Sequence, residues 1–416
     1  MSRGFRMSLI AALYCTQNLS LGMFTYAFLT IAQNEGVSLA TIGAASGLST
    51  MLVLKFLWAP LVDRYGSARL GHYRGWLLGS QLLLVIGCAT LALFDPAEQF
   101  GPLLMIFALL FLVAGTQDVA ADATATRLLA ASERGFGNGI QSAGSSIAQV
   151  VGGGLVLVLY QTAGWQAAAL FLAAFSALPM PFVLAWNEKR SSLGEPSPHV
   201  TFATVRSFFA RPVTRLWALR ILPLYFAGAA MAYGLIRPFL VDEQWSESRI
   251  GIVVVIVGSV FGVLAGLAGG IAIRSLGRRR AYRWLGVVQG IGCISVIVLT
   301  LGVTDIWFTV VVVALINAGI AAATALVYTI SMDLTRHDSA GTDFTLFSTL
   351  ASLVMVVAGG LGMGLSGAMG FAPVAGVALA LCAGGVLFGA PRLDKVLNAT
   401  TPSKGHDDEP DTVALA

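Results

Sequence analysis

Three ionisable side chains stand inside long apolar runs of the sequence, where a charge is costly. Lys55 precedes the polar Asp63 by eight residues, whereas Asp118 and Asp122 lie one helical turn apart, on one face, in a later run. At 1.5 Å per residue, Lys55 would lie about 12 Å from the end of its helix. Asp118 has a similar depth, counted back from Arg127. An unpaired charge at that depth costs at least a few kcal/mol.

The matched depths predict a contact between Lys55 and Asp118 that neutralises both charges. The alternative is that Lys55 extends to the membrane surface while the two aspartates cap or pair near the helix end. A charge pair in this setting can titrate or change partners. Lys55, Asp118 and Asp122 are therefore candidates to bind and release protons, and we assign them to coupling if the chain moves a solute across the membrane.

Other kinds of chemistry find little support in the sequence. Its four cysteines show no CxxC spacing, and its four histidines fall in loops or tails, so neither a metal site nor a cofactor site is predicted. A GxGxxG string at residues 362–367 lies within an apolar run with no strand before it, and no GxxxxGK[ST] occurs. We expect no enzyme, since a membrane-embedded one would need a cluster of histidine, cysteine or metal-binding residues.

The composition predicts that the elements carrying these residues are membrane helices. Hydrophobic residues make up 56% of the 416 and charged residues 11%, with a mean hydropathy of +0.80, whereas soluble domains carry about 25% charged residues. Twelve apolar runs are long enough to span a bilayer, roughly at 7–32, 40–62, 74–94, 102–126, 138–162, 166–186, 216–240, 249–273, 284–303, 307–331, 343–368 and 371–390. We expect an all-α membrane protein with the lipid bilayer as its surroundings and no nucleic-acid partner.

The basic residues between the runs predict an orientation. Most of them fall in alternate loops, which places both termini in the cytoplasm by the positive-inside rule. The longest polar break divides the chain into an N-terminal bundle of six helices, a linker, a C-terminal bundle of six helices and a tail. The predicted bounds are 1–186, 187–215, 216–390 and 391–416. Within the linker, residues 202–209 could form an amphipathic surface helix, and the acidic tail is predicted to be disordered.

A short basic stretch after the second run returns in weaker form in the second half. The first copy, KFLWAPLVDRYGSARLGHYRGW, starts at Lys55, and Gly270, Arg274 and Gly277 stand at the matching positions of the second. In both copies a small residue stands four before a polar one, and glycine follows three later. The pattern resembles the loops after helices 2 and 8 of the major facilitator superfamily of secondary transporters. The departures are Ala59 for the usual glycine, Ser-Ala after Gly66, and Arg274 for an acidic residue.

This resemblance implies two six-helix bundles that rock around a central site. It also implies a gating role for the loop residues Asp63, Arg64, Gly66 and Arg74, with Asp63 holding the halves in the outward-open state. Helices 1, 4, 7 and 10 would line the cavity. Amide and aromatic side chains on those helices and on helix 5 are the candidate substrate contacts: Tyr14, Gln17, Asn18, Gln117, Gln141, Tyr225, Tyr233, Asn317 and Tyr328. We interpret most membrane serines and threonines as interhelical hydrogen-bonding groups instead.

Four motifs of the first half narrow the resemblance. They are FLWAPLVDRY from Phe56, RGWLL from Arg74, QDVAAD from Gln117 and ERG from Glu133. They resemble the AmpG-related branch, which includes muropeptide permeases and the RhtX/FptX-type siderophore permeases of bacterial inner membranes. AmpG proteins proper usually have two further helices, and this chain has room for twelve, which favours the siderophore type.

The resulting expectation is an inner-membrane permease that imports an iron-siderophore of the ferric pyochelin or rhizobactin type, by proton-coupled alternating access. No obligate protein partner is evident. The alternative is a muropeptide permease of the AmpG type. A sugar-peptide would need more hydrogen-bonding groups in the cavity than the aromatic and glycine-rich faces supply. A membrane-embedded enzyme is the less favoured third interpretation.

Overall fold

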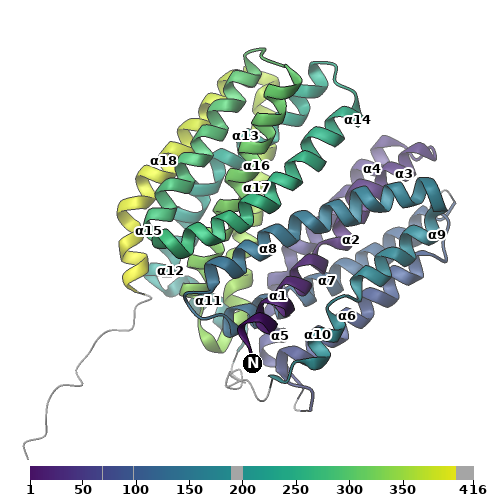
Figure 1. Ribbon diagram of the computed structural model, residues 1–416, viewed down its shortest axis with the longest axis vertical. Helices are drawn as coiled ribbons and strands as arrows, with labels where there is room; N and C mark the ends of the chain where they lie inside the picture. Colours follow the sequence, from purple (N-terminus) through teal and green to yellow (C-terminus); the bar gives the residue numbers. More distant parts are fainter. Residues whose placement is uncertain (68, 97, 189–199, 400–416) are drawn as a thin grey trace, which may run out of the picture.

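The described part of the chain is almost entirely helical. The computed structural model describes residues 1–67, 69–96, 98–188 and 200–399. Figure 1 shows the helices gathered into two bundles, one from the purple-to-teal first half and one from the green-to-yellow second half. The N-terminus lies at the same end as α5, α10 and α11, whereas α3, α4 and α14 lie at the other end. We call the first of these the basic end, because arginines 64, 134, 278 and 336 lie there, and we call the other the opposite end.

The first half crosses the expected thickness of a membrane six times. Its elements are α1 (Arg3–Gln17), α2 (Leu19–Gly22), η1 (Met23–Phe28) and α3 (Leu29–Asn34) in one crossing; α4 (Leu39–Ser46), η2 (Gly47–Leu57) and α5 (Ala59–Arg64); α6 (His72–Leu91); α7 (Phe100–Leu128); and α8 (Arg134–Gln149), η3 (Val150–Leu155), α9 (Val156–Ser176) and α10 (Met180–Ala185) in the last two.

The second half repeats this layout. Its elements are α12 (Pro212–Leu216), η5 (Trp217–Ile221) and α13 (Leu222–Asp242); α14 (Glu247–Ile250), η6 (Gly251–Val257) and α15 (Gly258–Thr300) in two crossings; α16 (Ile306–Leu334); η7 (His337–Ser339) and α17 (Ala340–Met369); and α18 (Phe371–Asn398). The predicted twelve membrane helices in two six-helix bundles are confirmed.

Two glycines turn a continuous helical stretch back on itself. Gly164 (φ 82°) and Gly277 (φ 76°) divide α9 and α15, in a backbone conformation that other residues adopt only with strain. The sequence predicts a loop between the eighth and ninth helices, at about 274–283. The break is present but shorter than predicted, because the arginines there are good helix formers and only Gly277 interrupts the helix.

The last helix also differs from its predicted end at residue 390. α18 continues through Pro391 to Asn398, since the proline removes one hydrogen bond whereas Leu393 and Val396 bury fully against the second bundle. The helix predicted at 202–209 is confirmed as α11 (Phe202–Ala210), with Phe208 buried and Phe202 exposed, and its place on the membrane surface stays a prediction. Residues 189–199 of the predicted linker and 400–416 of the predicted tail lie outside the described residues. The domain division stays a prediction.

Glycines bring the two bundles together along α8 and α15. A Cβ placed on Gly266 would lie 3.1 Å from the Ser142 Cβ, and one on Gly270 would lie 2.7 Å from the Gly135 carbonyl oxygen. Side chains larger than glycine would therefore push these helices apart, which agrees with the close approach that a glycine ladder in the eighth helix allows. Large side chains fill each bundle instead, as in the ring cluster of Phe24, Phe107 and Phe111.

Candidate functional site

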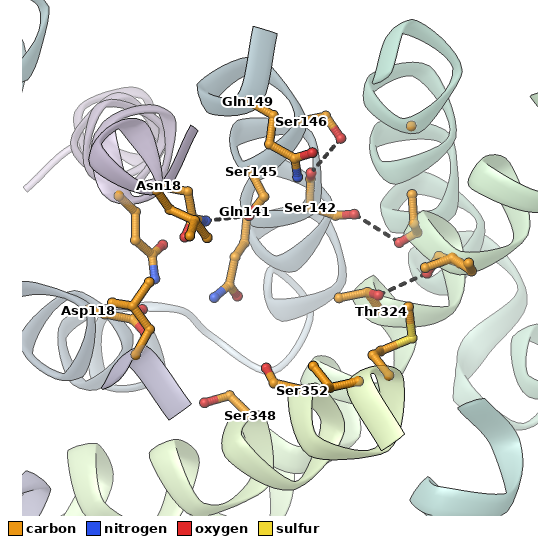
Figure 2. A pocket seen from close by; sticks show the side chains of 18 of the residues that line it. Asn18, Asp118, Gln141, Ser142, Ser145, Ser146, Gln149, Thr324, Ser348 and Ser352 are labelled. Atoms are coloured by element: carbon orange, nitrogen blue, oxygen red, sulfur yellow. Dashed lines mark hydrogen bonds between the residues drawn. The ribbon is translucent and has the colours of Figure 1, made fainter. Parts of the chain in front are cut away.

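A cavity of about 510 Å³ lies between the two halves. Helices of both halves line it, and most of the side chains on the first-half wall are polar. Figure 2 shows Asn18, Asp118, Gln141, Ser348 and Ser352 placed around a common space, with α8 along one side. The size falls within the range of small-molecule sites.

The charged part of the cavity wall comes from η2 and α7. The Lys55 ammonium donates to Asp118 Oδ2, and each of these side chains is 11% exposed. The contact predicted from their matched depths is therefore present, and Lys55 does not extend to the basic end. Pairing removes most of the cost of holding either charge here.

Asp122 lies one turn further along α7, and two neutral side chains donate hydrogen bonds to its carboxylate. Its Oδ1 accepts hydrogen bonds from the Tyr14 hydroxyl and from the Gln141 amide, each at 3.0 Å. The residue has no exposed surface, and its Oδ2 has no protein hydrogen-bond partner. Since Lys55 is engaged by Asp118, Asp122 is the carboxylate of this site that can take up a proton without first breaking an ion pair.

Six of the nine predicted substrate residues line the cavity, namely Gln17, Asn18, Gln141, Tyr233, Asn317 and Tyr328. Tyr14 does not, and acts one layer behind it on Asp122. Gln117 and Tyr225 do not line it either. Gln117 turns within its own bundle and donates to Gln81 Oε1 at 3.3 Å, whereas the Tyr225 hydroxyl donates to the Tyr282 carbonyl at 3.0 Å. Both lie on cavity helices, but on faces that look into a bundle.

Several further polar residues line the cavity. From the sequence, these residues were interpreted as helix-packing groups or were not singled out. They are Tyr26, Ser49, Ser142, Ser145, Ser146, Gln149, Ser259, Thr324, Ser348, Thr349 and Ser352. Their spacing along α8 and α17 places them on one face each, which was the available signal. Ser142 does also donate to the Ala321 carbonyl of the other half at 3.0 Å, as a packing hydroxyl would.

The basic end is closed by a carboxylate of the first half on a helix of the second. Asp63 accepts hydrogen bonds from the Gly341 and Thr342 backbone amides at 3.0 and 2.6 Å, at the start of α17. It also accepts from the Thr342 hydroxyl at 2.7 Å and from the Tyr73 hydroxyl at 2.7 Å. Burial raises the pKa of the Asp63 carboxyl, and these hydrogen bonds oppose the rise. We call Asp63, Gly341 and Thr342 the latch.

A second crossing contact lies near the latch. Asp333, at the end of α16, accepts from Arg134 of the first half at 2.8 Å and from Arg278 of the second half at 2.6 Å. Arg278 also donates to the Ala131 carbonyl of the first half at 2.8 Å. The cavity is therefore shut off from the basic end by contacts between oppositely charged or hydrogen-bonding groups.

The other predicted gating residues do not join the halves. Arg74 donates to the Val183 and Leu184 carbonyls at 2.9 and 2.8 Å, which ties the third helix to the sixth within one bundle. Arg64 is exposed and lies over the Tyr65 ring. Gly66 packs beside His72. Among these four loop residues, Asp63 is the one whose described contacts reach the second half.

Comparison with known proteins identifies this arrangement. Residues 10–359 match the Major Facilitator Superfamily. The chain belongs to this superfamily. Two solved structures share its fold: a bacterial homologue of the iron transporter ferroportin in an outward-facing state (TM-score 0.71, 17% identity, 96% of this chain and 100% of that one) and FucP in the outward conformation (TM-score 0.68, 16% identity, 94% and 97%). At these identities the likeness is one of fold.

The sequence relatives of this superfamily member include AmpG-type permeases. It is 29% identical to the anhydromuropeptide permease of Escherichia coli K12, over 78% of this chain and 67% of that protein. It is 25% identical to the putative transporter AmpG 4 of Rickettsia felis, over 77% and 80%. An uncharacterized protein of Haemophilus influenzae is 31% identical over 81% and 83%. The chain is thus a multi-pass membrane transporter that is similar to proteins of the AmpG type.

These relatives overturn the expected siderophore import. The named relatives are muropeptide or AmpG transporters. The argument from too few hydrogen-bonding groups also fails, because α8 and α17 supply a polar cavity wall that the sequence had assigned to helix packing. The count of twelve helices therefore does not favour a siderophore over a muropeptide as the substrate.

Proposed function

We propose that the protein is an inner-membrane permease that imports an anhydromuropeptide, an anhydro-sugar linked to a peptide, by proton-coupled alternating access. The relative at 29% identity suggests the substrate. The observation that carries the proposal is the cavity, whose wall is rich in amides and hydroxyls from both halves. Such groups match the hydroxyls and peptide groups of a sugar-peptide.

The cavity also has hydrogen-bonding capacity to spare. The oxygens Gln17 Oε1, Gln141 Oε1 and Thr349 Oγ1 are buried and have no protein partner. A buried acceptor without a partner costs about 1–3 kcal/mol, which a bound donor would recover once the side chain turns that oxygen toward the cavity. Sugar hydroxyls and peptide N–H groups are such donors, and an apolar solute offers none.

In the proposed cycle the described conformation is the outward-facing one. The latch and the Asp333 contacts close the basic end, and the basic end faces the cytoplasm if the positive-inside rule holds.

Cysteines introduced at Ser38 and Ser275, in a variant without native cysteines, should then react from opposite sides of the membrane. The cysteine at 38 should react with an impermeant reagent added outside, and reaction of both from outside would contradict this orientation.

Import of the proposed substrate can be measured directly. Bacteria that lack their own anhydromuropeptide permease should accumulate labelled anhydromuropeptide when they express this chain. Gln17→Leu keeps the side-chain bulk but removes a cavity oxygen, so uptake should fall about tenfold, as expected for roughly 1.4 kcal/mol. Gln166→Leu makes the same change at an exposed position of the opposite end and should leave uptake unchanged.

Two results would contradict the proposal. Cells whose membranes contain the protein, but which accumulate no more label than cells with an empty vector, would exclude this substrate. Equal uptake by the Gln17→Leu and Gln166→Leu variants would show that the substrate does not use this cavity.

A further inference from the structure

A second, smaller cavity opens on the lipid-facing surface of the second half, at the basic end. Its volume is about 180 Å³, and Pro212, Arg215, Leu216, Leu219 and Arg220 line it. These residues come from α12 and η5, the start of the seventh helix, which Figure 1 shows beside α11 and α18. Both arginines and Leu219 are exposed here, so this surface faces the lipid and its headgroups.

A local change of helix geometry brings the two guanidinium groups to this cavity. In a regular α-helix, residues five apart point about 140° from each other. The turn at Trp217–Ile221 is π-helical, so each backbone amide pairs with the carbonyl five residues earlier. Arg220 thereby comes round toward the face of Arg215. Such single turns occur often at functional sites.

The two positive charges have no protein counter-ion. Among the residues that the structure describes, no carboxylate lies within 4 Å of either guanidinium, whereas Arg211, Arg278, Arg279 and Arg336 nearby all have one. Arg220 also stands at the edge of an apolar helix, where an unpaired charge is costly. Two guanidiniums at one small cavity favour an anion with several oxygens, and a phosphate accepts from both.

We propose that this cavity binds the phosphate of an anionic phospholipid, such as phosphatidylglycerol. Arg215 and Arg220 hold the phosphate oxygens, and the acyl chains lie over Leu216 and Leu219. The inner side of the same turn is fixed to the neighbouring helix, since Trp217 Nε1 donates to Ser331 Oγ at 3.0 Å. Ser331 stands two residues before Asp333, so the lipid would support the helix end that closes the basic end.

The test measures phosphatidylglycerol retained by the full-length protein in detergent, by native mass spectrometry and by titration of the melting temperature. The double variant R215Q/R220Q should bind phosphatidylglycerol about thirtyfold more weakly, because each surface arginine contributes about 1 kcal/mol toward an anionic lipid and every 1.4 kcal/mol is a factor of ten. R215K/R220K should recover part of the loss. R274Q/R280Q removes two exposed arginines of the same end that also lack a described ion pair, and should bind as the unchanged protein does.

A titration with inorganic phosphate distinguishes a lipid phosphate from a free phosphate as the bound anion. At millimolar concentration it should neither displace phosphatidylglycerol nor raise the melting temperature, because it lacks acyl chains. Unchanged lipid binding in R215Q/R220Q would overturn the proposal, as would an equal loss in R274Q/R280Q, which would indicate diffuse attraction. Displacement by inorganic phosphate would overturn the assignment to a lipid. All variants must show the melting temperature of the unchanged protein before lipid is added.

Discussion

Asp122→Asn should abolish uphill uptake of the substrate and leave its passive exchange in place. The amide keeps the hydrogen bond from Tyr14 but cannot gain or lose a proton at neutral pH. Without a titrating group, the cycle can no longer use the proton gradient. We expect accumulation to fall at least tenfold, to the level set by equilibration. Counterflow, in which labelled substrate enters in exchange for unlabelled substrate, should stay within about twofold, since it needs no proton.

The ion pair beside Asp122 can be tested through stability. Lys55→Met or Asp118→Asn alone leaves an uncompensated charge and should lower stability in detergent, by roughly 3 kcal/mol for a buried pair. The double variant removes both charges and should recover part of that loss. Full uphill uptake by Asp122→Asn would contradict our assignment of the coupled proton. Asp118 would then be the next candidate.

Asp63→Asn should open the basic end without removing the protein from the membrane. The two carboxylate oxygens accept four hydrogen bonds, and an amide retains one good acceptor. Its NH₂ group would face either the donors of Thr342 or those of Gly341 and Tyr73. One buried donor left without an acceptor costs about 1–3 kcal/mol, so the population should move about tenfold toward the inward-open state. Transport should slow, because closing the basic end is part of each cycle.

Spin labels at positions 69 and 275, in a variant without native cysteines, can report this change as a longer distance across the basic end. Both residues are exposed, one in each half. Asp242→Asn, which removes an exposed carboxylate at the opposite end, should leave the distances unchanged. An unaltered distribution in Asp63→Asn, together with unaltered uptake, would rule out the latch.

The fold followed from the sequence because lipid imposes a simple rule on it. A helix that must span the membrane appears as one long apolar run, and turns require polar residues or glycine. The rule fails where the chain does not need a loop. Gly277 alone makes the corner in the arginine-rich stretch 274–283, and Pro391 does not end a helix whose next turn can bury Leu393.

The site was harder to predict, since spacing along a helix tells which residues share a face but not where that face points. The Lys55–Asp118 contact was accessible because a charge inside a span requires a partner. Tyr225 and Gln117 were misplaced because tyrosines and amides serve helix packing as readily as they serve a cavity. The serines of α8 and α17 were undervalued for the opposite reason, since hydroxyls can satisfy themselves within the helix, as Ser348 does on the Thr345 carbonyl.

The charged groups of the cavity all belong to the first half, and this decides how voltage acts on the transporter. Lys55 and Asp118 cancel, so an ionised Asp122 gives that wall one net negative charge, whereas the second-half residues that line the described cavity are uncharged. Moving one elementary charge across the whole membrane changes its free energy by about 2.3 kcal/mol for every 100 mV of membrane potential. If the empty carrier reorients with Asp122 ionised, that step feels the potential. Once Asp122 holds its proton, the described cavity wall carries no net charge, and in the loaded step this wall adds nothing to the charge that the substrate carries.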